Sequence, residues 1–417
     1  MEISASKFVR VFCRFTARQA WGIKQRGISA IRHKTLTVVG LAMALLPVLL
    51  IRAIRPIIFL RFGLIKGARI GHAASDPEFY LCERESGVQP KSLDLFYYHT
   101  PICNRQLKRM IERNMRVFSF VSYLDRVNRF LPGGARHTIL INGGTTEDEY
   151  GLLSRWPIHL SLNGEEKRRG QEGLESIGVP VGAPYVCFHF RDSAYMTTNF
   201  PGYDWSYHDF RKSSIQDYVP AIEELTQRGY YVVRMGSSVN ERLSTSNPKI
   251  IDYANNYRTE FLDIYLFSKC SFYLGSTAGI FSVPAIFRKP IAFANFTPVQ
   301  QRNTTGLKDL FIPKKLWLKK EERYMGFQEI FEANTGWYQL GEQYEALGIE
   351  HIENTPEEIT ALALEMDQRL EGLWQSSEED EELQNRFWSV FRPNEPNGVG
   401  VPRIGARFLR ENRGLLD

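Results

Sequence analysis

Charged side chains directly follow an apolar stretch in "YVCFHFRDSAY", residues 185–195. The apolar residues 185–188 predict a buried strand, and His189, Arg191 and Asp192 come at its end. An arginine can hold a phosphate through two parallel N–H bonds, and a histidine can donate another. We expect Arg191 and His189 to bind an anion. Asp192 would repel that anion, so we expect it to hold Arg191 or the loop that follows. The alternative is a strand-end salt bridge with no ligand.

A second stretch suited to phosphate is "LGSTAG" at residues 274–279, which follows one apolar stretch and precedes another. Small residues let a phosphate approach the backbone, and N–H groups at the start of a helix carry partial positive charge. The candidate phosphate-binding residues are Gly275, Ser276, Thr277, Ala278 and Gly279. A tight turn without a ligand is the alternative for this stretch. Two such stretches in one crevice would favour a ligand.

The pattern of the chain predicts a scaffold that brings these residues together. Strand-like and helix-like segments alternate from about residue 65, which is typical of an α/β fold with a parallel sheet. Five strands are expected in the second half, at residues 185–190, 230–237, 249–254, 271–279 and 289–296. A doubly wound sheet binds ligands beyond the carboxyl ends of its strands. His189, Arg191, Gly236 and the turn of residues 275–277 all fall at such ends, so one crevice should gather them.

The sequence lacks the patterns that are typical of several other kinds of site. The chain has no GxxxxGK[ST] loop, no Gly-rich dinucleotide pattern and no G-x-S-x-G turn. No D-x-D pair follows a strand, and the acidic stretch at 143–151 is better explained as a solvated turn than as a metal site. The five cysteines are scattered without a C-x-x-C pair, which indicates reduced thiols in a cytosolic protein and no structural zinc. We therefore expect neither a metal nor a cofactor.

The segment of residues 1–62 differs in composition from the rest. Residues 3–75 contain 13 Lys and Arg and no Asp or Glu, and residues 36–51 are uncharged throughout. This uncharged stretch is shorter than the roughly 20 residues that a spanning helix needs. Upstream, arginines recur every four residues opposite apolar residues, which is typical of a helix lying in a membrane surface. We expect residues 1–62 to attach in the plane of an acidic membrane, or as a re-entrant segment, and expect no nucleic acid as partner. A surface helix packed on the protein itself is the alternative.

Three stretches resemble known glycosyltransferases. "FHFRD" is similar to the motif of GDP-fucose-type fucosyltransferases, in which the arginine meets the β-phosphate of the donor. Residues 260–298 resemble the donor-site region of heptosyltransferases, with a helix, a strand, a Gly/Ser turn and a helix in that order. From about residue 50 onward the chain resembles a family of poorly characterised bacterial glycosyltransferases associated with surface polysaccharides. That family similarly shows "RIGH", a His-x-Arg-Asp strand end, "LGST.G" and a tail like "RIGARFLREN".

The resemblance implies a GT-B fold, in which two Rossmann-like α/β domains face a crevice. It places an acceptor domain at residues 63–165 and a nucleotide-sugar donor domain at 180–365. Residues 366–417 would be helices that return to the first domain, and 1–62 the apolar and amphipathic helical segment at the membrane. The implied location is the cytoplasmic face of the inner membrane.

The implied reaction moves a sugar from a nucleotide-diphosphate donor to a hydroxyl of a glycan or glycolipid, with inversion and without a metal. Arg191 and the N–H groups around residues 276–279 would stabilise the leaving group. The first domain would supply the base that inversion needs; His72 in "RIGHAASDPE" is the first candidate, followed by Asp76 and Glu78. A helix-capping or loop-fixing role is the alternative for His72. Asp252 is a candidate nucleoside contact and equally a turn former at a strand end.

Two rival functions fit the same residues. A nucleotide-sugar epimerase or hydrolase would use the same crevice without a sugar acceptor. A catalytically silent membrane-associated assembly protein would use the basic N-terminal segment alone. The charged strand end counts against the silent protein, because a buried arginine is costly without an anion or a carboxylate partner.

Overall fold

The computed structural model describes residues 37–141, 148, 150–191, 198, 202, 204–239, 242–243, 245–300, 306, 308–390 and 402–417. The chain divides into two compact units. The first consists of the chain up to Leu64, Lys91–Tyr98 and Met115–Ile139, and the second of Ile65–Pro90, His99–Asn114 and Leu140–Asp417. The amphipathic helix predicted before residue 20 and the loop residue Asp192 lie outside the described residues.

The first unit is built on a small sheet. Strands β1 (Leu60–Lys66) and β2 (Leu93–His99) are hydrogen-bonded to each other, and isolated parallel bridges join Phe62 to Thr138 and Phe96 to Val117. Helix α4 (Val121–Phe130), the 3₁₀ turn η1 (Gly134–His137) and a helix over residues 37–53 complete it. Ala44 and Val48 of that helix pack into a core with Phe62 and Val121.

The second unit contains a seven-stranded sheet whose strand pairs are all parallel, in the order β12-β8-β7-β6-β3-β4-β5. The strands are β3 (Tyr185–His189), β4 (Tyr231–Arg234), β5 (Ile250–Ile251), β6 (Tyr273–Gly275), β7 (Ile291–Phe296), β8 (Leu310–Pro313) and β12 (Arg403–Ile404). The five strands predicted from the sequence are thus confirmed, and the mixed α/β architecture with them. From β3 the chain runs outward through β4 and β5, then returns to the other side of β3 with β6. The switch point of this doubly wound sheet therefore lies between β3 and β6.

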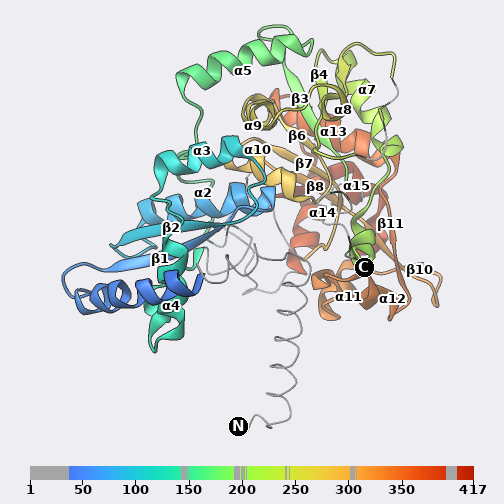
Figure 1. Cartoon of the computed structure of the whole chain (residues 1–417). Helices are drawn as coiled ribbons and strands as arrows, with labels where there is room; N and C mark the ends of the chain where they lie inside the picture. The colour runs from blue at the N-terminus through green and yellow to red at the C-terminus, as the bar shows by residue number, and fades with distance from the viewer. Residues whose placement is uncertain are drawn as a thin grey trace. The chain divides into compact units, whose positions relative to one another are not determined.

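Helices of the second unit pack on this sheet, on a smaller antiparallel sheet, or on other helices and turns (Figure 1). They are α2 (Ile70–Ser86), α3 (Arg105–Asn114), α5 (Gly164–Ser176), α7 (Val219–Gln227), α8 (Tyr253–Asn256), α9 (Glu260–Lys269), α10 (Ser282–Ile286), α11 (Phe327–Glu332), α12 (Gly341–Glu345), α13 (Pro356–Leu370), α14 (Glu378–Ser389) and α15 (Ala406–Glu411). Short 3₁₀ turns are η3 (Ser206–Arg211), η4 (Gln216–Tyr218), η5 (Gly279–Phe281), η6 (Thr335–Trp337) and η7 (Arg413–Leu416). Strands β9 (Lys315–Leu318), β10 (Arg323–Tyr324) and β11 (Ile349–Ile352) form a separate antiparallel sheet.

Local sequence sets several helix starts. Thr355 caps α13, where its hydroxyl accepts from the N–H of Glu358 and the Glu358 carboxylate accepts from the N–H of Thr355. Such a reciprocal pair satisfies two N–H groups that have no partner within the helix. The sequence Thr355-Pro356-Glu357-Glu358 therefore sets the start of this helix.

The compact units differ from the domain boundaries expected at 62/63 and near 165–180. Residues 65–90 and 99–114, which were expected in an acceptor domain of 63–165, group with the large sheet. A pair of Rossmann-like domains with a returning C-terminal segment stays a prediction. Within the described part of the chain, every helix is too short or too polar to cross a lipid bilayer.

Candidate functional site

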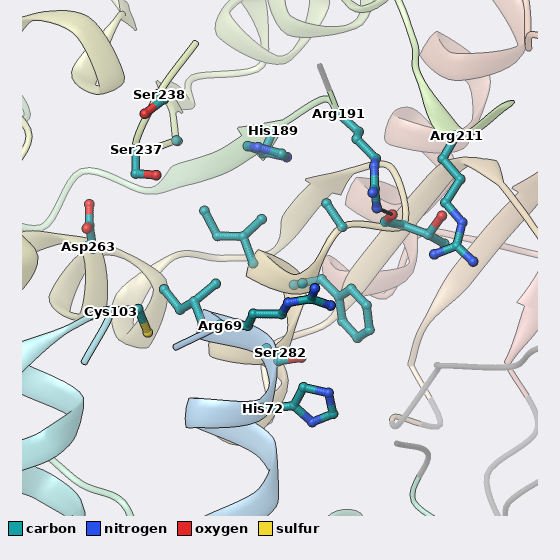
Figure 2. Close-up of a pocket in the computed structure, with 18 of the residues that line it drawn as sticks. Arg69, His72, Cys103, His189, Arg191, Arg211, Ser237, Ser238, Asp263 and Ser282 are labelled. Carbon is teal, nitrogen blue, oxygen red and sulfur yellow. Dashed lines mark hydrogen bonds between the residues drawn. The ribbon is translucent and has the colours of Figure 1, made fainter. Parts of the chain in front are cut away.

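A cavity of about 420 Å³ opens in the second unit at the carboxyl ends of its central strands (Figure 2). Its size is that of a small-molecule site. The wall includes the start of α2, the end of β3, the loops after β4 and β6, part of η3 and one residue of α9. Seven of the residues predicted from the sequence line it: His72, His189, Arg191, Gly236, Thr277, Ala278 and Gly279.

The ends of β3 and β6 are locked together beside the cavity. The N–H of Arg191 donates to the hydroxyl of Ser276 at 2.9 Å, and the N–H of Ser276 donates to the carbonyl of His189 at 3.3 Å. Gly275 lies opposite His189 in the strand register. Gly275 and Ser276 are buried and are not among the residues that line the cavity. They therefore position the strand ends from behind the cavity wall, and are not placed for the direct phosphate contact predicted from the sequence.

Three arginines converge on one part of the cavity. Figure 2 shows Arg69, Arg191 and Arg211 directed toward the same region. Burial, and then the charge of Arg69, lowers the pKa of Arg191, and burial and Arg191 lower the pKa of Arg211 to about 10. A fourth arginine in the wall, Arg258, lies 2.8 Å from Asp263, which is the single carboxylate of the described lining. The other three cations thus create a strongly positive region suited to an anion.

Two histidines beside these arginines are held neutral. Burial, followed by the charges of Arg234 and Arg191, lowers the pKa of His189 to about 3. Burial and the nearby arginines likewise lower the pKa of His208 to about 4. The Nδ1 atom of His189 is buried and has no hydrogen-bond partner among the described residues. A neutral imidazole can still donate one hydrogen bond, so His189 can contact a ligand without adding charge.

The first turn of α2 supplies further positive potential. Arg69 occupies the N-cap position without a side-chain capping bond, and the first turn contains no acidic residue. The N–H groups at a helix start lack partners within the helix and carry the positive end of its dipole. Gly71 lies so close to the loop after β6 that a Cβ atom there would be 3.1 Å from the Gly279 carbonyl oxygen. The helix start and the loop therefore form one continuous wall.

His72 and Asp76 form a pair on α2. Nδ1 of His72 lies 3.1 Å from Oδ1 of Asp76, one helical turn further on. If the carboxylate accepts the Nδ1 proton, Nε2 of His72 is left as the basic nitrogen. His72 lines the cavity, whereas Asp76 is buried and does not. Asp76 can therefore act only through His72, as a positioning residue.

Glu78, the third candidate base, does not reach the cavity. It is fully buried and accepts hydrogen bonds from the backbone N–H groups of His159 and Leu160 and from Arg288, at 3.1, 2.9 and 2.8 Å. Through these bonds the Glu78 carboxylate holds α2 to the segments that contain His159, Leu160 and Arg288.

No family model and no curated protein matches this chain. Among solved structures, ADP-heptose lipopolysaccharide heptosyltransferase II of E. coli is similar, with 12% identity, a TM-score of 0.38, and coverage of 61% of this chain and 90% of that one. A glycosyl transferase of family 9 from Veillonella parvula has 11% identity and a TM-score of 0.41, and covers 74% of this chain and 98% of its own.

The end of the cavity away from the three arginines is formed by other polar groups. Ser237, Ser238 and Asp263 lie there (Figure 2). Burial raises the pKa of Asp263 to about 6, although Arg258 opposes this shift. Asp252, the predicted nucleoside contact, is outside the lining. It accepts from the side chains of Arg234 and Asn255 and from the N–H of Leu243.

Sequence reasoning missed several polar residues of the wall, among them Arg69, His208, Arg211 and Asp263. Arg69 carried a signal, because it begins the "RIGH" element that also contains His72. Arg211 and His208 lie in the 3₁₀ turn η3, where no periodic pattern marks a functional face. Asp263 lies within a helix that is buried on most sides, so its sequence position gave no sign that it reaches a cavity.

A further cluster, Glu78, Cys82 and His159, has the ligand atoms of a metal site within 4.8 Å of one another. A guanidinium nitrogen of Arg288 lies 2.8 Å from Glu78 and 3.6 Å from the sulfur of Cys82. Burial raises the pKa of the Cys82 thiol to about 12, so the thiolate that a metal needs is disfavoured. A cation is thus already supplied by the chain, and the cluster does not fit a metal ion.

Proposed function

We propose that this protein is a glycosyltransferase that moves a sugar from a nucleotide-diphosphate donor to a hydroxyl of a glycan or glycolipid. The observation that carries the proposal is the convergence of Arg69, Arg191 and Arg211 on a cavity that also contains His72. The position of the cavity, at the switch point of a doubly wound sheet, supports a nucleotide as ligand. The proposal includes a GT-B arrangement, inversion and independence from a metal.

The arginines suit the charge that develops during transfer. Breaking the bond between the sugar C1 and the β-phosphate oxygen leaves a negative charge on the diphosphate. Preorganised donors that face this charge lower the barrier, because they need little reorganisation as the bond breaks. In this proposal Arg191 binds the diphosphate, and Arg69, Arg211 and the first turn of α2 add to the positive potential. The side chains thereby supply the neutralisation that a divalent cation would otherwise provide.

Inversion requires a base that takes the proton of the attacking hydroxyl on the opposite side of the sugar. We assign this role to Nε2 of His72. Asp76 would hold the imidazole in the correct tautomer and would stabilise the imidazolium that forms.

Nucleotide binding is the first experiment. The melting temperature of the full-length protein is measured with ADP, GDP, UDP and CDP, for the wild type and for Arg191→Ala. The matched control is Arg168→Ala, which removes an exposed arginine that pairs with Glu165 on α5. We expect one nucleotide to stabilise the wild type and the control but not Arg191→Ala. Stabilisation by none of them, in a folded protein, would contradict the proposal and favour the silent assembly protein.

Product analysis then separates transfer from the related reactions. The matching nucleotide sugar is incubated with and without a lipid and glycan extract that supplies acceptor hydroxyls. Nucleotide release that depends on the extract supports transfer. Equal release without it would identify a hydrolase, and interconversion of the donor sugar would identify an epimerase.

A further inference from the structure

The helix over residues 37–53 has two apolar faces, and the described residues of the chain cover only one of them. Ala44 and Val48 are buried in the core of the first unit, with Leu41 and Ile51 packed beside them. On the opposite side, large apolar side chains recur with the three- and four-residue spacing that places them on one helical face. These are Val39, Met43, Leu46 and Leu50, with exposed fractions of 48, 73, 65 and 56%.

The apolar surface continues past the end of the helix. Ile57 is 85% exposed and Ile58 47% exposed. We use "outer face" for Val39, Met43, Leu46, Leu50, Ile57 and Ile58 together. Arg52 fixes the helix end to the unit, because its guanidinium donates to the carbonyls of Asn128 and Pro132 at 2.8 and 2.7 Å. The outer face is therefore held outward from the unit that carries it.

The charges of the first unit are distributed unevenly. Its two described carboxylates, Asp94 and Asp125, are both buried, and they pair with Arg61 and Arg129 respectively. Apart from the half-buried Arg52, the other described cations of this unit are exposed. They are Arg55, Lys91, Arg116, Arg126 and Arg136. The described surface of this unit thus combines a broad apolar face with exposed positive charge and no exposed carboxylate.

We propose that the outer face docks this protein onto the surface of an anionic lipid bilayer. The helix would lie in the plane of the membrane, with Met43, Leu46 and Leu50 in the boundary between headgroups and acyl chains. Apolar side chains on one helical face and cations around it are the combination that binds such surfaces. The helix is not expected to cross the bilayer, because its other face is already packed into the core of the unit.

A second copy of the chain is a less suitable occupant. An isologous contact through the outer face would bring together two copies of Arg55, which lies between Leu50 and Ile57 in the chain, and the described part of the first unit exposes no carboxylate to pair with them. Acidic headgroups instead neutralise these cations as the apolar side chains become buried, so both features of the surface favour lipid.

The test is cosedimentation of the full-length protein with vesicles. One set contains 30% phosphatidylglycerol in phosphatidylcholine and the other phosphatidylcholine alone. The variant combines Met43→Gln, Leu46→Gln and Leu50→Gln, since glutamine is polar and keeps helix propensity. The matched control combines Val88→Gln, Leu347→Gln and Leu373→Gln, which are exposed apolar residues of the second unit. Ile57→Gln, outside the helix, is a second variant that leaves the helix sequence unchanged.

We expect the wild type and the control to bind the anionic vesicles. The triple outer-face variant should bind them at least about tenfold more weakly. Ile57→Gln should weaken binding in the same direction. Wild-type binding by both outer-face variants would overturn the proposal, as would equal binding of the wild type to both vesicle types. Sedimentation velocity without lipid provides a further check. A wild-type dimer that the triple variant abolishes would assign the face to a second copy instead.

Discussion

Gly275 faces His189 so closely across β6 and β3 that a Cβ atom on Gly275 would lie 2.1 Å from the His189 carbonyl oxygen. This approach brings the two strand ends to the same wall of the cavity, where the register pairs the same two residues. The absence of a side chain at residue 275 is therefore a condition for the site, although Gly275 itself is behind the wall.

The first prediction concerns Gly275→Ala. Because the conflict would be with the backbone, a flexible side chain cannot relieve it, and we expect the free energy of unfolding to fall by about 3 kcal/mol. Urea denaturation measures the loss. The control is Gly164→Ala, where the added Cβ would meet no atom within 4 Å. Equal midpoints for the two variants would show that the strands do not approach this closely.

The second prediction concerns the pair on α2. Asp76→Asn should lower turnover by about 10- to 100-fold, because the amide no longer holds the Nδ1 proton of His72 with a charge-assisted bond. Nucleotide affinity should stay unchanged, since Asp76 does not line the cavity. Steady-state kinetics with the identified donor, across pH 5–9, measure the effect together with the pH profile.

A double variant distinguishes a role of Asp76 through His72 from a separate structural role of Asp76. His72→Gln should lose at least as much turnover as Asp76→Asn, and the combination should lose no more than His72→Gln alone. Additive losses would mean that Asp76 acts independently of His72. Unchanged turnover in His72→Gln would remove His72 as the base.

The sequence predicted the scaffold of the site better than its full set of side chains. Strands such as β3 and β7 are continuous apolar runs, because both faces of a parallel sheet are buried, and such runs are visible without a structure. Their carboxyl ends could then be located, which explains why His189 and Arg191 were placed correctly beside Thr277 in one cavity.

The sequence could not separate the residues that line the cavity from those behind it. Ser276 follows its strand in the same way as Thr277, yet its hydroxyl is used by the N–H of Arg191. Asp252 ends a strand and is used by the local turn, whereas Asp263 reaches the cavity from inside a helix. Such differences depend on tertiary hydrogen bonds, which neither residue type nor spacing specifies.

The third prediction concerns the pH dependence of stability. Burial, with Lys314 and Arg211 nearby, lowers the pKa of His351 to about 3, against an ordinary value of 6.5. As the pH falls from 6.5 toward 3, the unfolded chain therefore takes up a proton that the folded chain does not. The free energy of unfolding should therefore decrease as the pH is lowered, and His351 should contribute up to about 1.4 kcal/mol per pH unit to this decrease.

The contribution of His351 has to be isolated by comparison. Burial raises the pKa of Asp263 to about 6, which has the opposite sign, since there the folded state binds the extra proton. Urea denaturation of the wild type and of His351→Gln between pH 7.5 and 4.5 removes this shared background. The curve of the variant should be flatter below about pH 6.5, where the unfolded wild type takes up a proton at His351 and the folded wild type does not. Parallel curves would mean that His351 is free to protonate in the folded protein.

The fourth prediction concerns the buried ion pair of Glu78 and Arg288, whose side chains lie 2.8 Å apart. Burial acts to raise the pKa of Glu78, but the hydrogen bond from His159 and the charge of Arg288 together hold it below its ordinary value. Glu78→Gln removes the charge and leaves the guanidinium without its partner in a largely buried place. We expect the free energy of unfolding to fall by about 3–5 kcal/mol.

An exposed pair of the same kind provides the matched control for this variant. Glu165 and Arg168 lie 2.6 Å apart on the surface of α5, where water and salt screen their attraction. Glu165→Gln should therefore leave the urea midpoint nearly unchanged, whereas Glu78→Gln lowers it strongly at the same pH. Both variants convert a glutamate that pairs with an arginine into its amide. The difference between their urea midpoints therefore measures the effect of burial on the ion pair. Equal midpoints would show that water reaches Glu78 and screens its attraction to Arg288.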